Sequence, residues 1–419
     1  MHPIVKPHPL TLTPSEQARL VAAVRALMTG NRVVVGNHCY TRPAPSVYEQ
    51  QWLWDSCFHA IILSHFDLPM AMDELRSLLW HAGVDTGGLF PHQIDWQGGS
   101  SELWGNPFVS FLTQPPLLAE AALCLYRRGA GPDFLREVYP QLRTYYHWLR
   151  TARDPDDDGL ISIIHPWESG WDASPRWDAL LGLSHPTPAE SKAARLRLAA
   201  ALRQGHRDAS TPATTMGFQV EPVDFNAIFA ANLEALALIA EAIGDHVGAA
   251  EWREMALRVR TAINARMWDG AAGCYWDLAG ADERPIRVLT AAPFVTLYGG
   301  VADESQAARL VAHLRSARFA APFPVPTVAM DEPSFAPDAY WRGNTWLPVN
   351  WLIGRGLQAY GHHELAADLT RHSLALVMQT GFYEYYHPLT GAGLGSHPHS
   401  WSGLVLDMVN SPFYDPPSS

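Results

Sequence analysis

Helix-forming segments rich in alanine and leucine recur along the chain and are separated by long loops. The first segment carries a complete start signal, with Thr13 as N-cap, Pro14 at the first helical position and Glu16 closing a capping box. Gly30 follows its last turn. Similar composition predicts helices over residues 57–66, 70–81, 117–127, 133–152, 189–203, 226–243, 246–267, 304–316, 346–360, 363–379 and 401–409. Alternating strand patterns are scarce, so we expect an all-α fold.

Many of these helices follow one another in consecutive pairs, which predicts helical hairpins that close into a ring. No linker divides the chain, so we expect a single domain over residues 10–415. Loops dense in Trp, Gly, Pro, His and Asp connect the helices at residues 37–55, 85–114, 161–178, 330–344 and 380–400. Loops this long inside a compact domain are usually functional. We expect them to open on one end of the ring and to build a single pocket.

Composition excludes several classes of partner. Of the 419 residues, 47% are hydrophobic and 17% are charged, which is enough for a large core and argues against disorder. The net charge is −12 and basic residues form no run, so nucleic acid and anionic membranes are not expected partners. No uncharged apolar run reaches about 18 residues and the N-terminus lacks a signal-peptide pattern. Cys39, Cys57, Cys124 and Cys274 have neither CxxC nor metal spacing. We expect reduced thiols and a cytoplasmic protein. The sequence does not decide whether the chain forms an oligomer.

The 16 tryptophans cluster with Gly, Asp and Asn instead of forming apolar stripes. Such clusters are typical of carbohydrate sites, where indole faces stack on sugar rings while acids and amides bind hydroxyls. A large aromatic core is the alternative interpretation. We therefore expect a small-molecule carbohydrate as substrate.

The segment HPWESGWDASPRWD, residues 165–178, places acids and indoles together. Asp172 follows Trp171, and Asp178 follows Arg176, with which it could be paired. Glu168 and Asp172 would repel each other on one helix face, so a loop is the better interpretation. For Glu168 we favour a structural hydrogen-bonding role.

Further polar candidates lie in the other loops. Glu384 in FYEYYHPLTGAGLGS is a carboxylate among aromatic residues, a setting that raises a pKa and suits proton transfer, although pairing with an arginine is the alternative. Asp55 either caps a helix or binds a hydroxyl. Gln93 and Gln114 either bind sugar hydroxyls or tie loop backbone together. In AYWRGNTW, Arg342 is the expected partner of one of the site acids.

Metal and cofactor motifs are weak in this sequence. DPDDDG, residues 154–159, matches the first half of an EF-hand loop, but the twelfth position holds His165 instead of a glutamate. We interpret it as an acidic turn and leave cation binding open. His397 and His399 flank Pro398 without a third ligand nearby, so no zinc site is expected. GxGxxG, P-loop and GxSxG motifs are missing, so we expect neither metal nor cofactor.

Four segments together resemble glycoside hydrolase family 63: WLWDSCFHA, HPWESGWDASPRWD, YWRGNTWLPVNWLIGRGLQAYG and FYEYYHPLTGAGLGSHPHSWSGLVLD. They are most similar to its bacterial mannosylglycerate and glucosylglycerate hydrolases, which are related to trehalases. The similarity spans residues 31–407. It departs from the family at residues 344–346, where many relatives have Pro-Val-Trp, and at residues 395–401.

The resemblance implies an (α/α)6 toroid, or six-hairpin barrel, and an inverting α-glycosidase. It implies that Asp172 is the general acid and Glu384 the general base. The residues that it implies for the sugar subsite are Trp54, Asp55, Gln114, Trp167, Gly170, Tyr340, Trp341 and Trp346. We add Gln93, Arg342 and Trp401 to the expected sugar-binding residues.

The substrate follows less directly from the sequence than the reaction. Glucosylglycerate or mannosylglycerate is the leading expectation, and a disaccharide or short oligosaccharide is the alternative. Candidates for a glycerate carboxylate are Lys192, Arg195, Arg197, Arg203 and Arg207, although most are expected on a solvated helix face. A sugar epimerase, which would need a histidine pair, and a non-catalytic sugar-binding protein are the rivals from other classes.

Overall fold

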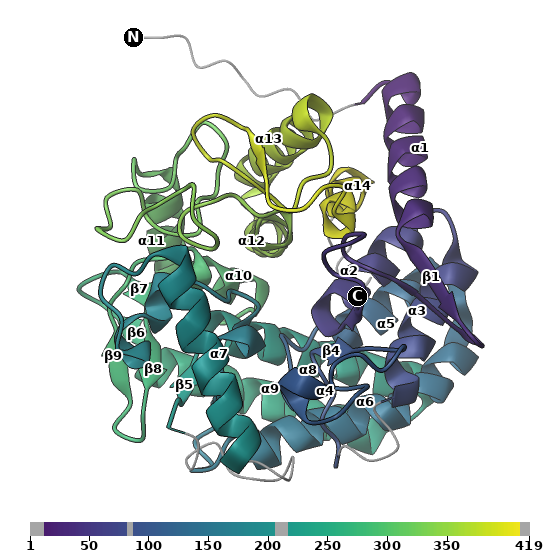
Figure 1. The fold of residues 1–419 in the computed structure, drawn as a ribbon, viewed down its shortest axis with the longest axis horizontal. Helices are drawn as coiled ribbons and strands as arrows, with labels where there is room; N and C mark the ends of the chain where they lie inside the picture. Colours follow the sequence, from purple (N-terminus) through teal and green to yellow (C-terminus); the bar gives the residue numbers. More distant parts are fainter. Residues whose placement is uncertain (1–11, 82–86, 206–216, 411–419) are drawn as a thin grey trace.

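The computed structural model describes residues 12–81, 87–205 and 217–410. A closed series of helices forms its inner layer, and each member packs against the next (Figure 1). The series consists of α2 (Leu53–Leu63), α5 (Leu118–Leu125), α8 (Val223–Ile243), α10 (Val295–Tyr298), α12 (Leu347–Ala359) and the 3-10 turn η7 (Ser400–Leu404), which leads into α14 (Val405–Asn410). The series closes because η7 packs against α2.

Longer helices cover the inner layer from outside. They are α1 (Pro14–Gly30), α3 (Leu68–His81), α6 (Gly131–Arg153), α9 (His246–Arg266), α11 (Glu304–Arg315) and α13 (His363–Thr380). Helices α3, α6, α9 and α13 each pack against the inner helix that precedes them in the chain, and α1 packs against η7 and α14. The predicted helical hairpins are therefore confirmed. Buried apolar side chains from Leu20 to Met408 form one contiguous hydrophobic core.

The structure confirms the predicted start of α1 and corrects the predicted start of α2. Thr13 caps α1 and forms the predicted capping box with Glu16, while Gly30 is the last helical residue and Asn31 the C-cap. Helix α2 begins at Leu53, with Trp52 in the N-cap position. Asp55 is therefore not an N-cap, because it lies inside the first turn, and its carboxylate is available for another role.

Helix α8 is long and apolar enough to cross a membrane by length and hydropathy. In this fold, however, 83% of its most apolar window is buried. It packs against α5, α6, α9 and α10. This placement is that of a core helix in the inner layer.

Short strands, which the sequence pattern did not reveal, lie in the segments between the helices. They are β1 (Arg32–Val35), β2 (His38–Thr41), β3 (Gln51–Trp52), β4 (Gln93–Ile94), β5 (Val220–Glu221), β6 (Trp268–Asp269), β7 (Cys274–Tyr275), β8 (Asp277–Ala279), β9 (Arg284–Ile286), β10 (Tyr385–Tyr386) and β11 (Gly393–Leu394). All pairings are antiparallel. The β3–β4 pair places Trp52 opposite Gln93, and a bridge joins Thr345 to Tyr386. These links hold loops that are distant in sequence at one place.

The remaining helical segments lie in the loops. They are α4 (Ser101–Trp104), α7 (Pro188–Gly205), η1 (Tyr126–Ala130), η2 (Pro166–Ser169), η3 (Pro175–Trp177), η4 (Ala179–Leu181) and η6 (Ala292–Phe294). Helix α7 crosses in front of the other helices in Figure 1 and lies beside α4. It therefore borders the loops of residues 85–114 and 161–178.

Candidate active site

A cavity of about 270 Å³ lies where the five long loops meet. Every one of these loops contributes to its wall, as the sequence predicted. The residues that line the cavity are Pro43, Val47, Tyr48, Trp52, Trp54, Asp55, His92, Gln93, Leu103, Trp104, Gln114, Trp167, Gly170, Asp172, Tyr340, Glu384, His399 and Trp401. Indole and phenol rings therefore surround a small number of acids and amides, an arrangement that suits a sugar ring.

Gly170 fixes the position of the segment that carries Asp172. Its φ is +75°, and a Cβ atom built there would lie 2.7 Å from the Trp54 ring. A side chain at this position would therefore collide with the indole as well as strain the backbone. Trp54 in turn meets Trp401 edge to face, with ring centroids 5.8 Å apart. The close approach joins the loop of residues 161–178 to the start of α2.

Glu384 is almost completely buried, with 3% of its surface exposed, and four hydrogen bonds hold its carboxylate. Tyr48 and Tyr340 donate their hydroxyls to Oε1 at 3.1 and 3.0 Å. Ser396 donates its backbone N–H and its hydroxyl to Oε2 at 2.9 and 3.0 Å. Burial raises the pKa of Glu384, and these donors oppose the increase.

Asp172 is partly exposed to the cavity. Burial raises its pKa to about 7, the charge of Arg195 opposes this change, and the charge of Glu384 adds to it. Asp172 can therefore stay protonated near neutral pH. A neutral carboxylic acid and a hydrogen-bonded carboxylate on the wall of the same cavity are the two groups that general acid and base catalysis requires.

Asp55 is the third acid of the cavity, with 4% of its surface exposed. Burial raises its pKa well above the usual range, and the charges of Glu384 and Asp172 contribute further. The side-chain oxygen of Gln114 accepts a hydrogen bond from the backbone N–H of Trp54 at 3.3 Å. Gln93 likewise accepts from the indole N–H of Trp104 at 2.7 Å. Both amides tie loops together, as the alternative interpretation held, and both also line the cavity.

Trp341 and Trp346 do not lie on the cavity wall. Their rings stack on each other at 3.6 Å, and Trp346 also stacks on Tyr385. Their exposed fractions are 1% and 0%, and neither belongs to the residues that line the cavity. The stack instead supports Tyr340, whose ring lies 5.3 Å from that of Trp346. This placement differs from the expected sugar contact.

Arg342 was expected to pair with an acid of the site, and the structure corrects this prediction. Its guanidinium forms a two-pronged ion pair with Asp178, and one contact measures 3.0 Å. Asp178 is not paired with Arg176, whose buried guanidinium binds Asp224 and Asp277. Arg342 also donates to the backbone carbonyl of Ala173, one residue after Asp172. It therefore holds the segment that carries the acid and not the acid itself.

The structural interpretation of Glu168 agrees with its contacts. The side chain is completely buried and pairs with Arg153 at 2.7 Å. It also accepts backbone N–H groups from Thr113 and Ile164 at 3.1 and 2.8 Å. Glu168 therefore joins the segment of residues 161–178 to α6 and to the loop of residues 85–114.

Comparison with known proteins now decides the family. The family model described as mannosylglycerate hydrolase MGH1-like glycoside hydrolase domain matches residues 48–402. The chain belongs to this glycoside hydrolase family. It is 35% identical over 403 residues to a mannosylglycerate hydrolase of Thermus thermophilus, covering 87% of this chain and 95% of that protein. It is 28% identical over 453 residues to glucosylglycerate hydrolase of Mycolicibacterium hassiacum, covering 96% of this chain and 100% of that protein.

A solved structure of the same kind superposes closely. It is the crystal structure of a family 63 mannosylglycerate hydrolase from Thermus thermophilus in complex with Tris and D-glycerate. The TM-score is 0.85 at 32% identity, covering 93% of this chain and 99% of that chain. The chain is thus a family 63 glycoside hydrolase that is similar to mannosylglycerate and glucosylglycerate hydrolases. The resemblance that was inferred from the four motifs is confirmed.

Several residues of this glycoside hydrolase site were not identified from the sequence. Tyr48, Trp52, His92, Trp104 and His399 all line the cavity. Burial lowers the pKa of His92 to about 3 and that of His399 well below its usual range. A neutral imidazole can accept a proton but is a poor donor, so this pair lacks the acid that an epimerase would need. Trp-rich composition was the available signal for the indoles, but single tyrosines and histidines gave none.

The basic candidates on α7 separate into two groups. Lys192, Arg197 and Arg203 are exposed, as predicted, whereas Arg207 lies outside the described residues. Arg195 is buried, with 7% of its surface exposed, and its Nε has no hydrogen-bond partner among the described residues. Its Nη1 donates to Ser191 at 2.7 Å. Its charge acts on Asp172, so one cation of this helix lies close to the acid.

Proposed function

We propose that the chain is an inverting α-glycosidase that hydrolyses a glycosylglycerate, with glucosylglycerate and mannosylglycerate as the two substrates. The observation that carries this proposal is the presence of Asp172 and Glu384 on one small cavity lined by indoles. The relatives named mannosylglycerate and glucosylglycerate hydrolase support the substrate class. The closed series of inner helices and its outer partners support an (α/α)6 toroid as the scaffold.

The two acids act in opposite senses on the glycosidic bond. Asp172, protonated because of its raised pKa, donates its proton to the glycosidic oxygen as the bond breaks. Glu384 takes a proton from a water that attacks the anomeric carbon from the other face. An inverting pair leaves room for this water when the carboxyl groups stand about 6.5–9.5 Å apart, against about 5 Å for a retaining pair. The α-glycoside then yields a β-sugar first.

The remaining acids and amides hold the sugar during this step. Asp55 has a strongly raised pKa, so its carboxyl group can donate a hydrogen bond to a sugar hydroxyl. The amide nitrogens of Gln93 and Gln114 are further donors, because their oxygens are already engaged with Trp104 and Trp54. Trp54, Trp167 and Trp401 provide the ring faces.

Arg195 supports a substrate whose leaving group carries a carboxylate. It lies close to Asp172, the group that protonates the leaving oxygen, and part of its guanidinium is unpaired among the described residues. An arginine can bind a glycerate carboxylate through two parallel hydrogen bonds. We infer that Arg195 is the leaving-group cation.

An α-linked disaccharide is the second candidate substrate. The observation in its favour is that the described residues that line the cavity include neither arginine nor lysine. A wall without a cation would accept an uncharged second sugar. Arg195 would then serve only to tune Asp172.

One assay separates these proposals. Purified protein is incubated with mannosylglycerate, glucosylglycerate, trehalose and nigerose, and the first product is followed by proton NMR. We expect the highest kcat/KM on a glycosylglycerate and a β-anomer as the first product. A preference for either disaccharide supports the second candidate. With a glycosylglycerate, whose leaving group has no anomeric carbon, a first-formed α-anomer contradicts inversion and the roles of both acids.

A further inference from the structure

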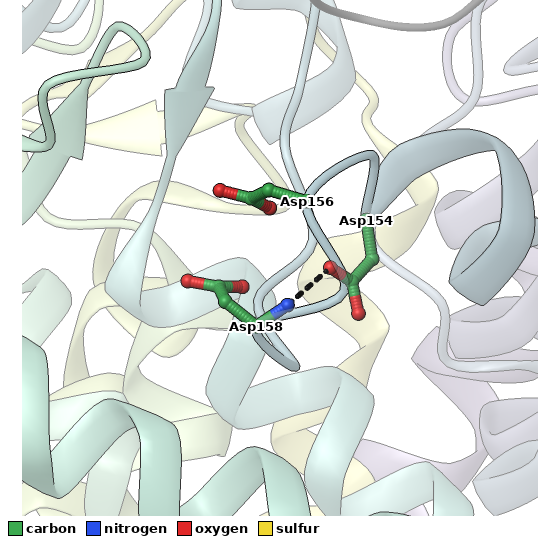
Figure 2. A group of neighbouring side chains, drawn as sticks. All are labelled: Asp154, Asp156 and Asp158. Carbon is green, nitrogen blue, oxygen red and sulfur yellow. Dashed lines mark hydrogen bonds between the residues drawn. The ribbon is translucent and has the colours of Figure 1, made fainter.

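An acidic loop outside the active site connects α6 to the segment of residues 161–178. Asp154, Asp156 and Asp158 bring one carboxylate oxygen each within 4.8 Å of one another. Figure 2 shows the carboxylates of Asp156 and Asp158 on the same side of the loop, with Asp154 across from them. Their alternate spacing, followed by Gly159, is the spacing of the first half of an EF-hand loop.

Backbone groups already shape this loop around Asp154. The N–H groups of Asp158 and Gly159 donate to the two oxygens of Asp154 at 3.0 and 3.1 Å. The N–H of Leu160 donates to Oδ1 of Asp158 at 2.7 Å. The chain therefore keeps three carboxylates close together although they repel one another.

A fourth carboxylate, far away in sequence, adds an independent observation. The Ile163–Val220 bridge brings β5 against the segment that leaves the loop, so Glu221 reaches Ser162, whose backbone N–H donates at 2.7 Å to the carbonyl of Arg153 directly before the loop. Glu221 is 3% exposed. Its Oε1 contacts the Ser162 hydroxyl at 3.4 Å, but Oε2 has no hydrogen-bond partner among the described residues. The negative charges of Asp158 and Asp156 also act on Glu221.

Nearby arginines do not neutralise this group. Arg150 and Arg258 pair with Asp157, whose side chain does not belong to the cluster. Arg266 reaches Asp158 at 3.3 Å and also pairs with Glu283, which adds a further negative charge. Within the described parts of the chain, Asp154, Asp156 and Glu221 have no ion-pair partner. A buried carboxylate oxygen without a partner, close to further acids, is unfavourable in its ionised form unless a cation compensates its charge.

We propose that Asp154, Asp156, Asp158 and Glu221 form a binding site for a divalent cation of the calcium class. All four donors are carboxylate oxygens, which hard cations prefer, and the set contains neither a thiolate nor an imidazole. Glu221 supplies the carboxylate that the loop itself lacks, since His165 stands at its twelfth position. This glutamate could not be recognised from the loop sequence, because it lies 62 residues beyond the loop's Gly159 and reaches it only through the fold.

The site lies immediately before the segment that carries Asp172. Arg153, one residue before the loop, forms the buried pair with Glu168. Two residues after the loop, the backbone N–H of Ile161 donates to Asn226 of α8 at 2.6 Å. A cation bound between these anchors would brace the start of the segment of residues 161–178. Its role is structural and does not depend on the substrate that the enzyme hydrolyses.

Calcium titration of the full chain tests the site. Protein that has been treated with EDTA and dialysed is titrated with CaCl₂ by calorimetry, and the Tm is measured with and without 1 mM CaCl₂. We expect one cation per chain and a Tm increase of at least about 2 °C. MgCl₂ is titrated in parallel, and a smaller response is expected because Mg²⁺ demands octahedral geometry.

Three variants locate the cation. Asp156→Asn and Glu221→Gln should each weaken calcium binding at least about ten-fold, because each removes one negative ligand. Asp157→Asn is the matched control, since it lies in the same loop but pairs with arginines, and its calcium affinity should equal that of the wild type. Absence of binding and of a Tm shift in the wild type up to about 5 mM CaCl₂ overturns the proposal. Equal losses in Asp156→Asn and Asp157→Asn overturn it as well, because they indicate only unspecific attraction to an acidic surface.

Discussion

Asp172 and Glu384, two of the three acids of the cavity, differ in how the protein surrounds them. Glu384 receives four hydrogen bonds from Tyr48, Tyr340 and Ser396. Within the described part of the chain, the Asp172 carboxyl receives none from another side chain, and it meets only the more distant charge of Arg195. Burial raises both pKa values, but only at Glu384 do neighbouring donors stabilise the ionised form.

This difference bears on which acid donates a proton and which accepts one. A carboxyl without side-chain donors favours the neutral form, which is the form that protonates a leaving group. A buried carboxylate with four donors favours the ionised form, which accepts a proton from water. The environment therefore supports the proposed roles of Asp172 as acid and Glu384 as base, independently of the family resemblance. The predictions below test this difference, beginning with the largest effect.

Neutral isosteres at the two positions should abolish turnover. Asp172→Asn cannot donate the proton and Glu384→Gln cannot accept one, so each should lower kcat at least about 10³-fold while substrate binding largely survives. Single-turnover kinetics and calorimetric titration with substrate measure the two quantities. Circular dichroism of each variant controls for folding. A folded variant that keeps more than about a tenth of the wild-type kcat would remove that residue from its role.

Neutral substitutions of two acids that lie four residues apart should have different effects on the free energy of unfolding. Glu168→Gln leaves the buried guanidinium of Arg153 without its anion and should cost about 3 kcal/mol in the free energy of unfolding. Asp172→Asn should cost nothing, because the raised pKa of Asp172 means that its charged form is unfavourable in the folded state. Urea denaturation at pH 8 compares the two. Equal losses would show that Asp172 is also a structural residue.

Much of this arrangement could be predicted from local sequence patterns. The helices, their pairing and the meeting of five loops follow from composition, capping signals and loop length. The dense indoles around Asp172 and Glu384 indicated a sugar site because such clusters are rare elsewhere.

Pairings across the fold could not be predicted in the same way. Arg342 pairs with Asp178, 164 positions away, and Tyr48 reaches Glu384 across 336. Neither spacing leaves a local signal. Asp55 occurred at an expected helix start, yet the helix begins two residues before it because Trp52 pairs with Gln93 in a short sheet. Tertiary contacts therefore determine the roles of these residues, and residue type alone does not predict them.

Removal of one hydrogen-bond donor from Glu384 should make the surroundings of its carboxylate more like those of Asp172. Tyr48→Phe deletes the hydroxyl bound to Oε1, so the pKa of Glu384 should rise and the acidic limb of kcat/KM should move to higher pH. We expect about a ten-fold loss at pH 5 and a smaller loss at pH 7. Tyr385→Phe is the control, because that tyrosine stacks on Trp346 and does not donate to Glu384 in the structure. A loss that is the same at every pH would indicate a role in sugar binding instead.

Replacement of Arg195 should shift the pH profile by a smaller amount. The direction of the shift follows from the loss of its positive charge near Asp172. The protonated form of Asp172 is the active one, so activity should be present below its pKa of about 7 and decline as the pH rises through that value. The charge of Arg195 lowers this pKa, so Arg195→Met should raise it and move the basic limb upward by less than about one pH unit. The same variant should raise KM for a glycosylglycerate, but not for an aryl α-glycoside with a neutral leaving group. Lys192→Met, on the exposed face of α7, should change neither quantity. A basic limb that stays in place or moves downward would show that Arg195 does not act on Asp172, and an unchanged KM for the glycerate substrate would remove it from the leaving-group site.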